Sequence, residues 1–454
     1  MTSPPLKPSV MRDETDGDAL HSSIHPPLPK LQVLNEAHRC LYCYEAPCTK
    51  ACPTHIDVPA FIRKIATGNL LGSARVIMEA NPVGASCARV CPTENLCEGA
   101  CVLAPDEAPI HIGDLQRYAT DWAREHDVQL FTPGPDSGRH VAVVGGGPAG
   151  LAAARELRRF GHAVTLFETK PKLGGLDTYG IVPFRLPMEA ALWEAEQVIN
   201  MGVNVRTDTV VGLDISADAI VSEFDAVVLA CGMGYVPELG IPGEDLSGVW
   251  DAIEFIERAK TGETVSVPGR VAVIGAGNTA IDAATCARRL GAEEVVIYYR
   301  RTDREMTAYP SEYEFAKKEG VEFRWRCLPV RILGGGGRVQ GIEFVATDLV
   351  READGRQQVL PIPGSEFMVA VDVVIRAIGQ SRRTALLKAF GVAHTGGVVK
   401  TDGTRTNLSK VFAAGDCTFA KGGREAMVVE AAEQGKQAAR EVHAFLCGQG
   451  KGGM

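Results

Sequence analysis

Cysteines crowd into one short stretch of this chain, and that crowding limits what its N-terminal quarter can fold into. Eight of the 13 cysteines lie between Cys40 and Cys101, and the first thirty residues contain no apolar core of an export signal. Because cytosolic thiols stay reduced, such a cluster is more typical of metal binding than of a disulfide framework. The sequence therefore predicts a cytoplasmic protein with a small metal-bound unit.

The eight cysteines form two groups. The first has C-x2-C-x4-C-x3-C-P spacing, which resembles the ferredoxin run. The groups are Cys40, Cys43, Cys48 and Cys52, then Cys87, Cys91, Cys97 and Cys101. Eight thiolates in two groups can hold two [4Fe–4S] clusters. Two structural zinc sites are the alternative, but zinc ribbons favour paired C-x2-C knuckles and only one occurs here. We interpret the other five cysteines as buried apolar side chains.

Composition excludes several classes of protein. A length of 454 residues allows about three domains. The net charge of -9 disfavours a nucleic-acid binder, which needs a basic face. No apolar run reaches the roughly 18 residues that span a bilayer, so we expect no membrane segment.

A strand, a glycine-rich turn and a helix occur twice, with the turns 130 residues apart. The first copy covers a strand at 141–144, a helix at 151–160 and a strand at 163–168. The second covers 271–274, 280–290 and 295–299. Alternating strands and helices of this kind predict an α/β fold with two Rossmann-like dinucleotide-binding domains.

The first turn has the full dinucleotide fingerprint. Gly145 permits the tight turn, Gly147 lets the backbone approach a pyrophosphate, and Gly150 allows the helix to pack closely on the strand. The helix starts at Pro148-Ala149 and offers free N–H groups to phosphates. Glu168 ends the next strand, where a carboxylate can accept a hydrogen bond from a ribose hydroxyl.

The second copy differs from the first in two respects. It reads Gly275-Ala276-Gly277-Asn278-Thr279, with Ala280 in place of the third glycine, a variant that the fingerprint allows. The following strand ends in Arg300-Arg301 instead of an acid. Two guanidinium groups there can bind a 2′-phosphate, and the alternative is an exposed surface pair.

Two later strands complete the predicted sites. The strand at 371–375 is followed by Ala377 and Gly379, and the strand from Val411 delivers Gly415-Asp416 before a helix at 428–439. All four residues are expected at a cofactor. Two dinucleotide folds followed by such a strand imply a flavoprotein with tightly held FAD and a nicotinamide that exchanges. Residues 334–337 are interpreted as a hairpin turn.

These patterns predict the following organisation. Helices are expected at 58–65, 71–79 and 112–125. The predicted parts are a disordered tail at 1–30, a helical iron–sulfur domain at 31–130, an FAD domain at 138–240 and 376–454, and a NAD(P) domain at 241–375.

The order of these parts resembles the glutamate synthase small subunit and the N-terminal part of dihydropyrimidine dehydrogenase, whose bacterial form is split into two chains. The segments most similar to the NAD-dependent dihydropyrimidine dehydrogenase family are Asn81-Pro82, Cys91-Pro92-Thr93-Glu94, residues 109–113, Leu115-Gln116, Gly174-Gly175-Leu176 and Phe184-Arg185-Leu186-Pro187. The resemblance implies cofactor-binding roles for Leu176 and Arg185.

The resemblance also implies how the clusters are held. One cluster would use Cys40, Cys43, Cys48 and Cys101, and the other Cys52, Cys91, Cys97 and Gln116. Spacing alone nominates Cys87 as the eighth ligand, whereas the resemblance nominates Gln116 and makes Cys87 a non-ligand. The question stays open between these two residues, and we follow the resemblance.

The function implied is that of an electron-input subunit. Such a subunit oxidises NAD(P)H through FAD and supplies a partner through its clusters, as part of a hetero-oligomer. The expected partner is the FMN-containing catalytic subunit of dihydropyrimidine dehydrogenase, because the printed sequence contains no FMN barrel. The alternatives are a glutamate synthase large chain or a ferredoxin as acceptor, and a flavin reductase with a structural zinc module.

Overall fold

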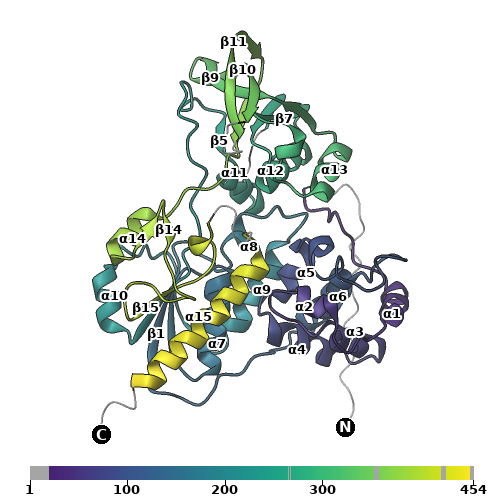
Figure 1. Ribbon diagram of the computed structural model, residues 1–454, viewed down its shortest axis with the longest axis vertical. Coiled ribbons are helices and arrows are strands. Elements are labelled where there is room, and N and C mark those ends of the chain that lie inside the picture. Colours follow the sequence, from purple (N-terminus) through teal and green to yellow (C-terminus); the bar gives the residue numbers. More distant parts are fainter. Residues whose placement is uncertain (1–19, 264, 266, 352–356, 421–425, 450–454) are drawn as a thin grey trace.

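The computed structural model describes residues 20–263, 265, 267–351, 357–420 and 426–449. Figure 1 shows a helical N-terminal unit, a first parallel sheet beside it, and a second parallel sheet from which an antiparallel sheet projects. The predicted α/β class with two dinucleotide-type units is confirmed. Residues 1–19, predicted to be disordered, lie outside the described residues.

The N-terminal unit is built from short helices. They are α1 (Lys30–Arg39), α2 (Pro47–Ala51), α3 (Val58–Ala66), α4 (Leu70–Ala80), α5 (Gly84–Val90) and α6 (Ile112–Glu125), with the 3₁₀ turn η1 (Thr93–Asn95). Asp57 caps α3 by accepting from Ala60 N at 3.1 Å, and Asn69 caps α4 by accepting from Gly72 N at 2.9 Å. The three predicted helices are confirmed as α3, α4 and α6.

The first sheet has the strand order β15-β4-β1-β2-β3, with all neighbours parallel. Its strands are β1 (His140–Val144), β2 (Ala163–Phe167), β3 (Asn204–Arg206), β4 (Ala226–Leu229) and β15 (Val411–Ala413). The helices that accompany them are α7 (Pro148–Arg159), α8 (Leu176–Tyr179), α9 (Met188–Ile199), α10 (Ala217–Glu223), α14 (Thr384–Phe390) and α15 (Val428–Gln449).

The second sheet has the order β5-β12-β6-β7-β8 and is inserted in the sequence between β4 and β15. Its elements are β5 (Val249–Asp251), α11 (Ala252–Lys260), β6 (Arg270–Ile274), α12 (Asn278–Arg289), β7 (Glu294–Tyr299), η2 (Asp303–Glu305), α13 (Pro310–Lys318), β8 (Glu322–Trp325) and β12 (Val373–Arg376). Both glycine turns therefore follow the central strand of a parallel sheet, where such sheets bind their ligands.

An antiparallel sheet projects from the second sheet at the top of Figure 1. It consists of β9 (Cys327–Gly335), β10 (Arg338–Arg351) and β11 (Gln357–Val369). The predicted hairpin turn is confirmed, since Gly336 and Gly337 join β9 to β10 with positive φ angles of 62° and 79°. A small ladder of β13 (His394–Thr395) and β14 (Val398–Val399) and the turn η3 (Asp416–Thr418) complete the fold.

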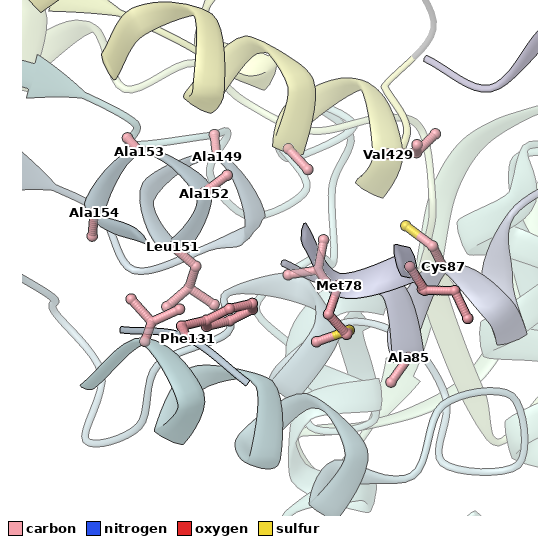
Figure 2. Packing of buried hydrophobic residues seen from close by; sticks show 14 of the residues in the cluster. Met78, Ala85, Cys87, Phe131, Ala149, Leu151, Ala152, Ala153, Ala154 and Val429 are labelled. Atoms are coloured by element: carbon pink, nitrogen blue, oxygen red, sulfur yellow. The ribbon is translucent and has the colours of Figure 1, made fainter. Parts of the chain in front are cut away.

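The helical unit is joined to the first sheet's helices by buried cations. The guanidinium of Arg155 on α7 donates to the carbonyl of Glu79 at 3.0 Å, and Lys436 Nζ on α15 donates to Ala80 O at 2.7 Å. Both carbonyls belong to the C-terminal turn of α4, where the helix dipole favours positive charge. Figure 2 shows the small side chains of α7, among them Ala149 and Ala153, on the side that meets α15.

Part of the expected tail is ordered, which corrects the prediction for residues 20–29. Leu20 is buried in the core of the second sheet. Ile24 N donates to Phe184 O at 3.1 Å, and Arg289 Nη1 donates to Ser22 O at 2.7 Å. Residues 20–25 form a turn and bends against the body, and Pro26, Pro27 and Pro29 keep the following residues out of a helix until α1 begins. Among the five scattered cysteines, Cys447 is exposed instead of buried.

Candidate functional site

A cavity of about 1190 Å³ opens where the two parallel sheets and the helical unit meet. Ligand pockets for drug-sized molecules usually measure about 300–1,000 Å³, so this cavity has room for a dinucleotide. Predicted cofactor residues in its wall are Gly145, Gly147, Pro148, Ala149, Glu168, Leu176, Arg185, Asn278, Thr279, Gly415 and Asp416. One wall is formed by Val90, Cys91 and Pro92 of the helical unit.

The first glycine turn is shaped by close backbone contacts. Gly145 has φ of 109°, and a Cβ there would collide with Ala230 O. A Cβ at Gly150 would collide with Gly145 O, so only glycine lets α7 start this close to β1. At Gly147 a Cβ would lie 3.7 Å from its nearest neighbour outside the turn, Gly175 Cα. The turn therefore leaves open space beside the helix N-terminus, which is where a phosphate binds.

Glu168 fixes the turn as well as facing the cavity. Its Oε2 accepts from Gly146 N at 2.8 Å, and its Oε1 accepts from Lys170 N at 2.9 Å and from the Thr169 hydroxyl at 3.0 Å. A carboxylate has about four acceptor positions, so one remains for a ribose hydroxyl. These contacts are compatible with the predicted hydrogen bond to a ribose hydroxyl. In addition, Glu168 holds the glycine turn in place, which was not predicted.

Replacing Glu168 with alanine is expected to yield protein depleted in FAD. The substitution leaves a ribose hydroxyl and Gly146 N without an acceptor, at a cost of about 1–3 kcal/mol for each buried group. Flavin absorbance per chain after gel filtration measures the loss. Glu223→Ala, at an exposed carboxylate on α10, serves as the control. Full FAD occupancy of Glu168→Ala at low protein concentration would contradict this placement of the adenosine half.

Asp416 approaches the same cavity from β15. Gly415 has φ of 79°, and its N–H donates to Gln434 Oε1 on α15 at 2.7 Å, which turns the chain toward the start of α7. Burial raises the pKa of Asp416 to about 6, and the Arg382 guanidinium opposes that rise. A carboxyl group held in this way can accept a sugar hydroxyl when it is ionised.

The second glycine turn meets the cavity only at its helix end. Gly275 has φ of 132°, and a Cβ there would collide with Ala377 O. Asn278 Oδ1 accepts from Tyr309 N at 3.1 Å, and Thr279 also lies in the cavity wall. The other residues predicted at a cofactor lie outside the cavity lining; they are Gly150, Gly275, Ala276, Gly277, Arg300, Arg301, Ala377 and Gly379.

Arg185 lies in the cavity wall but already has two acidic partners. Its Nη1 is 2.9 Å from Asp282 Oδ1 on α12, and its Nη2 is 2.5 Å from Glu312 Oε1 on α13. These ion pairs tie the segment after α8 to the second sheet's helices. Arg185 thus lies between the two nucleotide units. The cofactor-binding role that the resemblance implies for it stays a prediction.

The first predicted set of cluster ligands surrounds one small cavity. The structure brings Cys40, Cys43, Cys48 and Cys101 into its lining, although Cys101 is 53 residues beyond Cys48. Burial raises the pKa of the Cys48 thiol to about 11. An iron ion bound there would have to displace a proton, and its binding would then be coupled to folding of the unit.

One member of the second set, Cys91, lies in the wall of the large cavity. Burial raises the pKa of Cys97 well above its usual value, and the neighbouring Cys91 and Cys52 add to that rise. Gln116 Nε2 donates to Gly84 O at 2.7 Å, so Oε1 is left to bind iron. Cys87 is buried on α5, and its Sγ accepts from Asn81 Nδ2 at 3.1 Å. Both Gln116 and Cys87 are thus held in place, and the choice of eighth ligand stays a prediction.

The type of donor fits iron–sulfur clusters, because thiolates are the ligands that such clusters use and four of them line one small cavity. Within the described ranges, no three Cys, His, Asp or Glu side chains form a group that could hold a single metal ion.

Comparison with known proteins agrees with this site. Residues 19–128 match the family model described as dihydropyrimidine dehydrogenase domain II, 4Fe-4S cluster, and residues 139–435 match pyridine nucleotide-disulphide oxidoreductase. The chain belongs to the pyridine nucleotide-disulphide oxidoreductase family. It is an NAD(P)H-dependent oxidoreductase with an FAD- and NAD(P)-binding region and a 4Fe–4S domain.

Relatives of this oxidoreductase span nearly the whole chain. It is 34% identical to the NAD-dependent dihydropyrimidine dehydrogenase subunit PreT of Escherichia coli, over 93% of this chain and 96% of that protein. It is 33% identical to the glutamate synthase [NADPH] small chain of the same species, over 98% and 96%. The solved structure of Mycobacterium tuberculosis FprA in complex with NADPH has a TM-score of 0.58 at 20% identity, over 70% of this chain and 86% of that one. The last likeness concerns the fold alone.

Four acidic residues in the cavity wall of this oxidoreductase were not predicted from the sequence: Asp177, Glu257, Asp282 and Glu312. Asp177 follows Gly174-Gly175-Leu176 directly and lies, almost fully buried, in the wall of the large cavity. An acid beside a glycine pair was the signal that could have found it. In the described part of the chain, no helix combines the length and apolar character needed to cross a bilayer.

Proposed function

We propose that this chain takes electrons from NAD(P)H and supplies them, through two [4Fe–4S] clusters, to a separate FMN-containing subunit that reduces uracil or thymine. The observation that carries the proposal is the position of Cys91. It lies in the wall of the large cavity and also beside Cys97 of the second cysteine set. When bound, FAD exchanges electrons in pairs with nicotinamide and singly with clusters.

The first cysteine set leads from there to the surface. Cys40, Cys43 and Cys101 are each partly exposed. Around them Leu41 is 62% exposed and Tyr44 is fully exposed, although both side chains are large and apolar. Exposed apolar groups of this kind mark contact sites for other proteins. Electrons arriving at this set can therefore leave to a docked subunit.

The experiment uses the purified chain and NADH. We expect it to reduce an artificial one-electron acceptor but neither uracil nor thymine, and to reduce both pyrimidines once an FMN-containing dihydropyrimidine dehydrogenase subunit is added. The large chain of glutamate synthase and a ferredoxin are tested in parallel as acceptors. Pyrimidine reduction by the single chain, or transfer only to one of these alternatives, would contradict the proposed partner.

We also expect NADH to be the better substrate, with detectable use of NADPH. Arg300 is exposed at the end of β7, and an exposed charge contact is typically worth about 0–1 kcal/mol. Thr307, where an NADP-using relative is expected to have a third cation, packs on the second glycine turn, with its N–H 3.2 Å from Ala276 O. The attraction of Arg300 for a 2′-phosphate should therefore be modest, and we expect kcat/KM to be higher for NADH than for NADPH.

The test compares kcat/KM for the two nucleotides in the wild type, in Arg300→Ala and in the control Arg304→Ala, which removes an exposed charge nearby. Arg300→Ala should lower kcat/KM for NADPH only. A wild-type preference for NADPH above about a hundredfold, which corresponds to about 2.7 kcal/mol, would show that the arginine pair binds the phosphate strongly.

A further inference from the structure

One buried acid of the first sheet's unit reaches into the helical unit. Glu194 lies on α9 and is 1% exposed. Its Oε1 accepts from Ala85 N at 2.6 Å and from Ser86 N at 3.0 Å, and its Oε2 accepts from the Ser86 hydroxyl at 2.5 Å. Among the described residues, all hydrogen bonds of this carboxyl group therefore go to the first turn of α5.

Glu194 and α5 depend on each other for their hydrogen bonds. A buried carboxyl group is costly unless hydrogen bonds satisfy it, and the donors to Glu194 belong to the other unit. The backbone N–H groups of Ala85 and Ser86 have no partner inside their helix, because they lie in its first turn. A displacement of α5 would leave polar groups on both sides without partners, so the contact fixes one position of the helix.

Helix α5 connects this contact to two predicted ligands of the second cluster. At its start, Gly84 O accepts from Gln116 Nε2 at 2.7 Å. At its end, the helix stops at Cys91, whose N–H donates to Cys87 O at 3.1 Å. Cys91 lies in the wall of the large cavity. The position of α5 therefore decides where both predicted ligands lie relative to that cavity.

The other contacts across this boundary do not fix the direction of α5. Figure 2 shows Ala85 and Cys87 of α5 in the same buried apolar cluster as Leu151 of α7, but apolar packing is non-directional. Arg155 and Lys436 bind the C-terminal turn of α4, which precedes α5. Among the described residues, the hydrogen bonds that join α5 itself to the first sheet's unit are those of Glu194.

We infer that Glu194 is a positioning residue for electron transfer between the flavin and the second cluster. It holds α5 so that Cys91 and Gln116 keep a fixed place beside the large cavity. Reactions between bound groups are sensitive to shifts of about 1 Å, so a displaced α5 would slow the transfer while both cofactors stay bound. The inference rests on the proposed function, since it concerns electrons that pass from FAD to the [4Fe–4S] clusters.

Two conservative variants separate the position of the side chain from its charge. Glu194→Asp keeps the charge but shortens the side chain by one carbon–carbon bond, about 1.5 Å, so α5 must move or lose its acceptor. Glu194→Gln keeps the length: its carbonyl oxygen can accept from Ala85 N and Ser86 N, and its amide N–H can donate to the Ser86 hydroxyl. Glu196→Asp, at an exposed residue of the same helix, is the matched control.

Stopped flow with NADH is carried out on anaerobic protein with full iron, sulfide and flavin content. We expect Glu194→Asp to reduce its clusters on the order of tenfold more slowly than the wild type, with flavin bleaching unchanged. Glu194→Gln and Glu196→Asp should match the wild type in both steps. Hydrogen exchange, which needs no turnover, should be faster over Gly84–Val90 in Glu194→Asp alone. If that variant loses iron or flavin, Ser86→Ala, which removes one of the three hydrogen bonds, should show the same changes to a smaller extent.

The outcomes separate this role from the proposed function. A wild-type transfer rate in cofactor-loaded Glu194→Asp would overturn the inference, because a purely structural contact predicts that result. Slower transfer in Glu194→Gln with an unchanged rate in Glu194→Asp would also overturn it, since the charge and not the position would then matter. In both cases the proposed function stands. If NADH reduces the wild-type flavin while the clusters stay oxidised, the proposed function fails and the positioning role fails with it.

Discussion

Replacing Cys43 with serine is expected to remove about four of roughly eight iron atoms per chain, because the proposed function places two four-iron clusters on separate sets of ligands. Cys43 shares one small cavity with Cys40, Cys48 and Cys101. The loss should therefore be confined to that cluster. Iron and acid-labile sulfide are measured on anaerobically purified protein.

Cys87→Ala provides the matched comparison. Cys87 already accepts a hydrogen bond from Asn81, and Gln116 is oriented with its carbonyl oxygen free. We therefore expect the alanine variant to keep the wild-type iron content. A loss of about four iron atoms in Cys87→Ala would make Cys87 the eighth ligand. Stoichiometric zinc without sulfide in the wild type would contradict both clusters.

Replacing Gly150 with alanine is expected to abolish FAD binding and to destabilise the first sheet. A Cβ at this position would collide with the carbonyl oxygen of Gly145, so α7 must move away from β1. Overpacking of this kind costs about 1–3 kcal/mol, and here the displaced helix start is also the proposed phosphate site. Flavin content and the thermal unfolding midpoint measure both effects.

Gly448→Ala is the matched control, because it makes the same glycine-to-alanine change at a position with free space. Gly448 lies near the end of α15, and a Cβ there would have nothing within 4 Å. Alanine favours helix over glycine, so stability should stay the same or rise slightly. If Gly150→Ala binds FAD as well as Gly448→Ala does, the cofactor does not use this helix start.

Local patterns were sufficient to predict the elements that carry the glycine turns. Apolar strands before Gly145 and Gly275 and long helices after them have strong periodicity, and the structure places them as predicted. The short helices α2 and α5 were missed, because five and seven residues are too few to show a helical period. Both carry cysteines, whose spacing had been interpreted only for metal binding.

Contacts between distant segments were beyond sequence reasoning. The cofactor-binding role that the resemblance implies for Arg185 stays a prediction, whereas its two acidic partners lie on helices that start 93 and 125 residues later and could not be predicted. Glu194 on α9 accepts a hydrogen bond from Ser86 on α5, and no spacing in the sequence links these two residues. Segment 20–29 looked disordered because its partners lie far along the chain, at Phe184 and Arg289.

The most direct test of the account is an anaerobic titration of the isolated chain with NADH, followed by absorption and electron paramagnetic resonance. Because Cys91 lies in the wall of the large cavity, we predict that electrons from NADH reach the clusters. We expect flavin bleaching together with the resonance of reduced [4Fe–4S] clusters, and loss of part of that resonance in Cys43→Ser. Flavin that is reduced by NADH while the clusters stay oxidised would contradict the account.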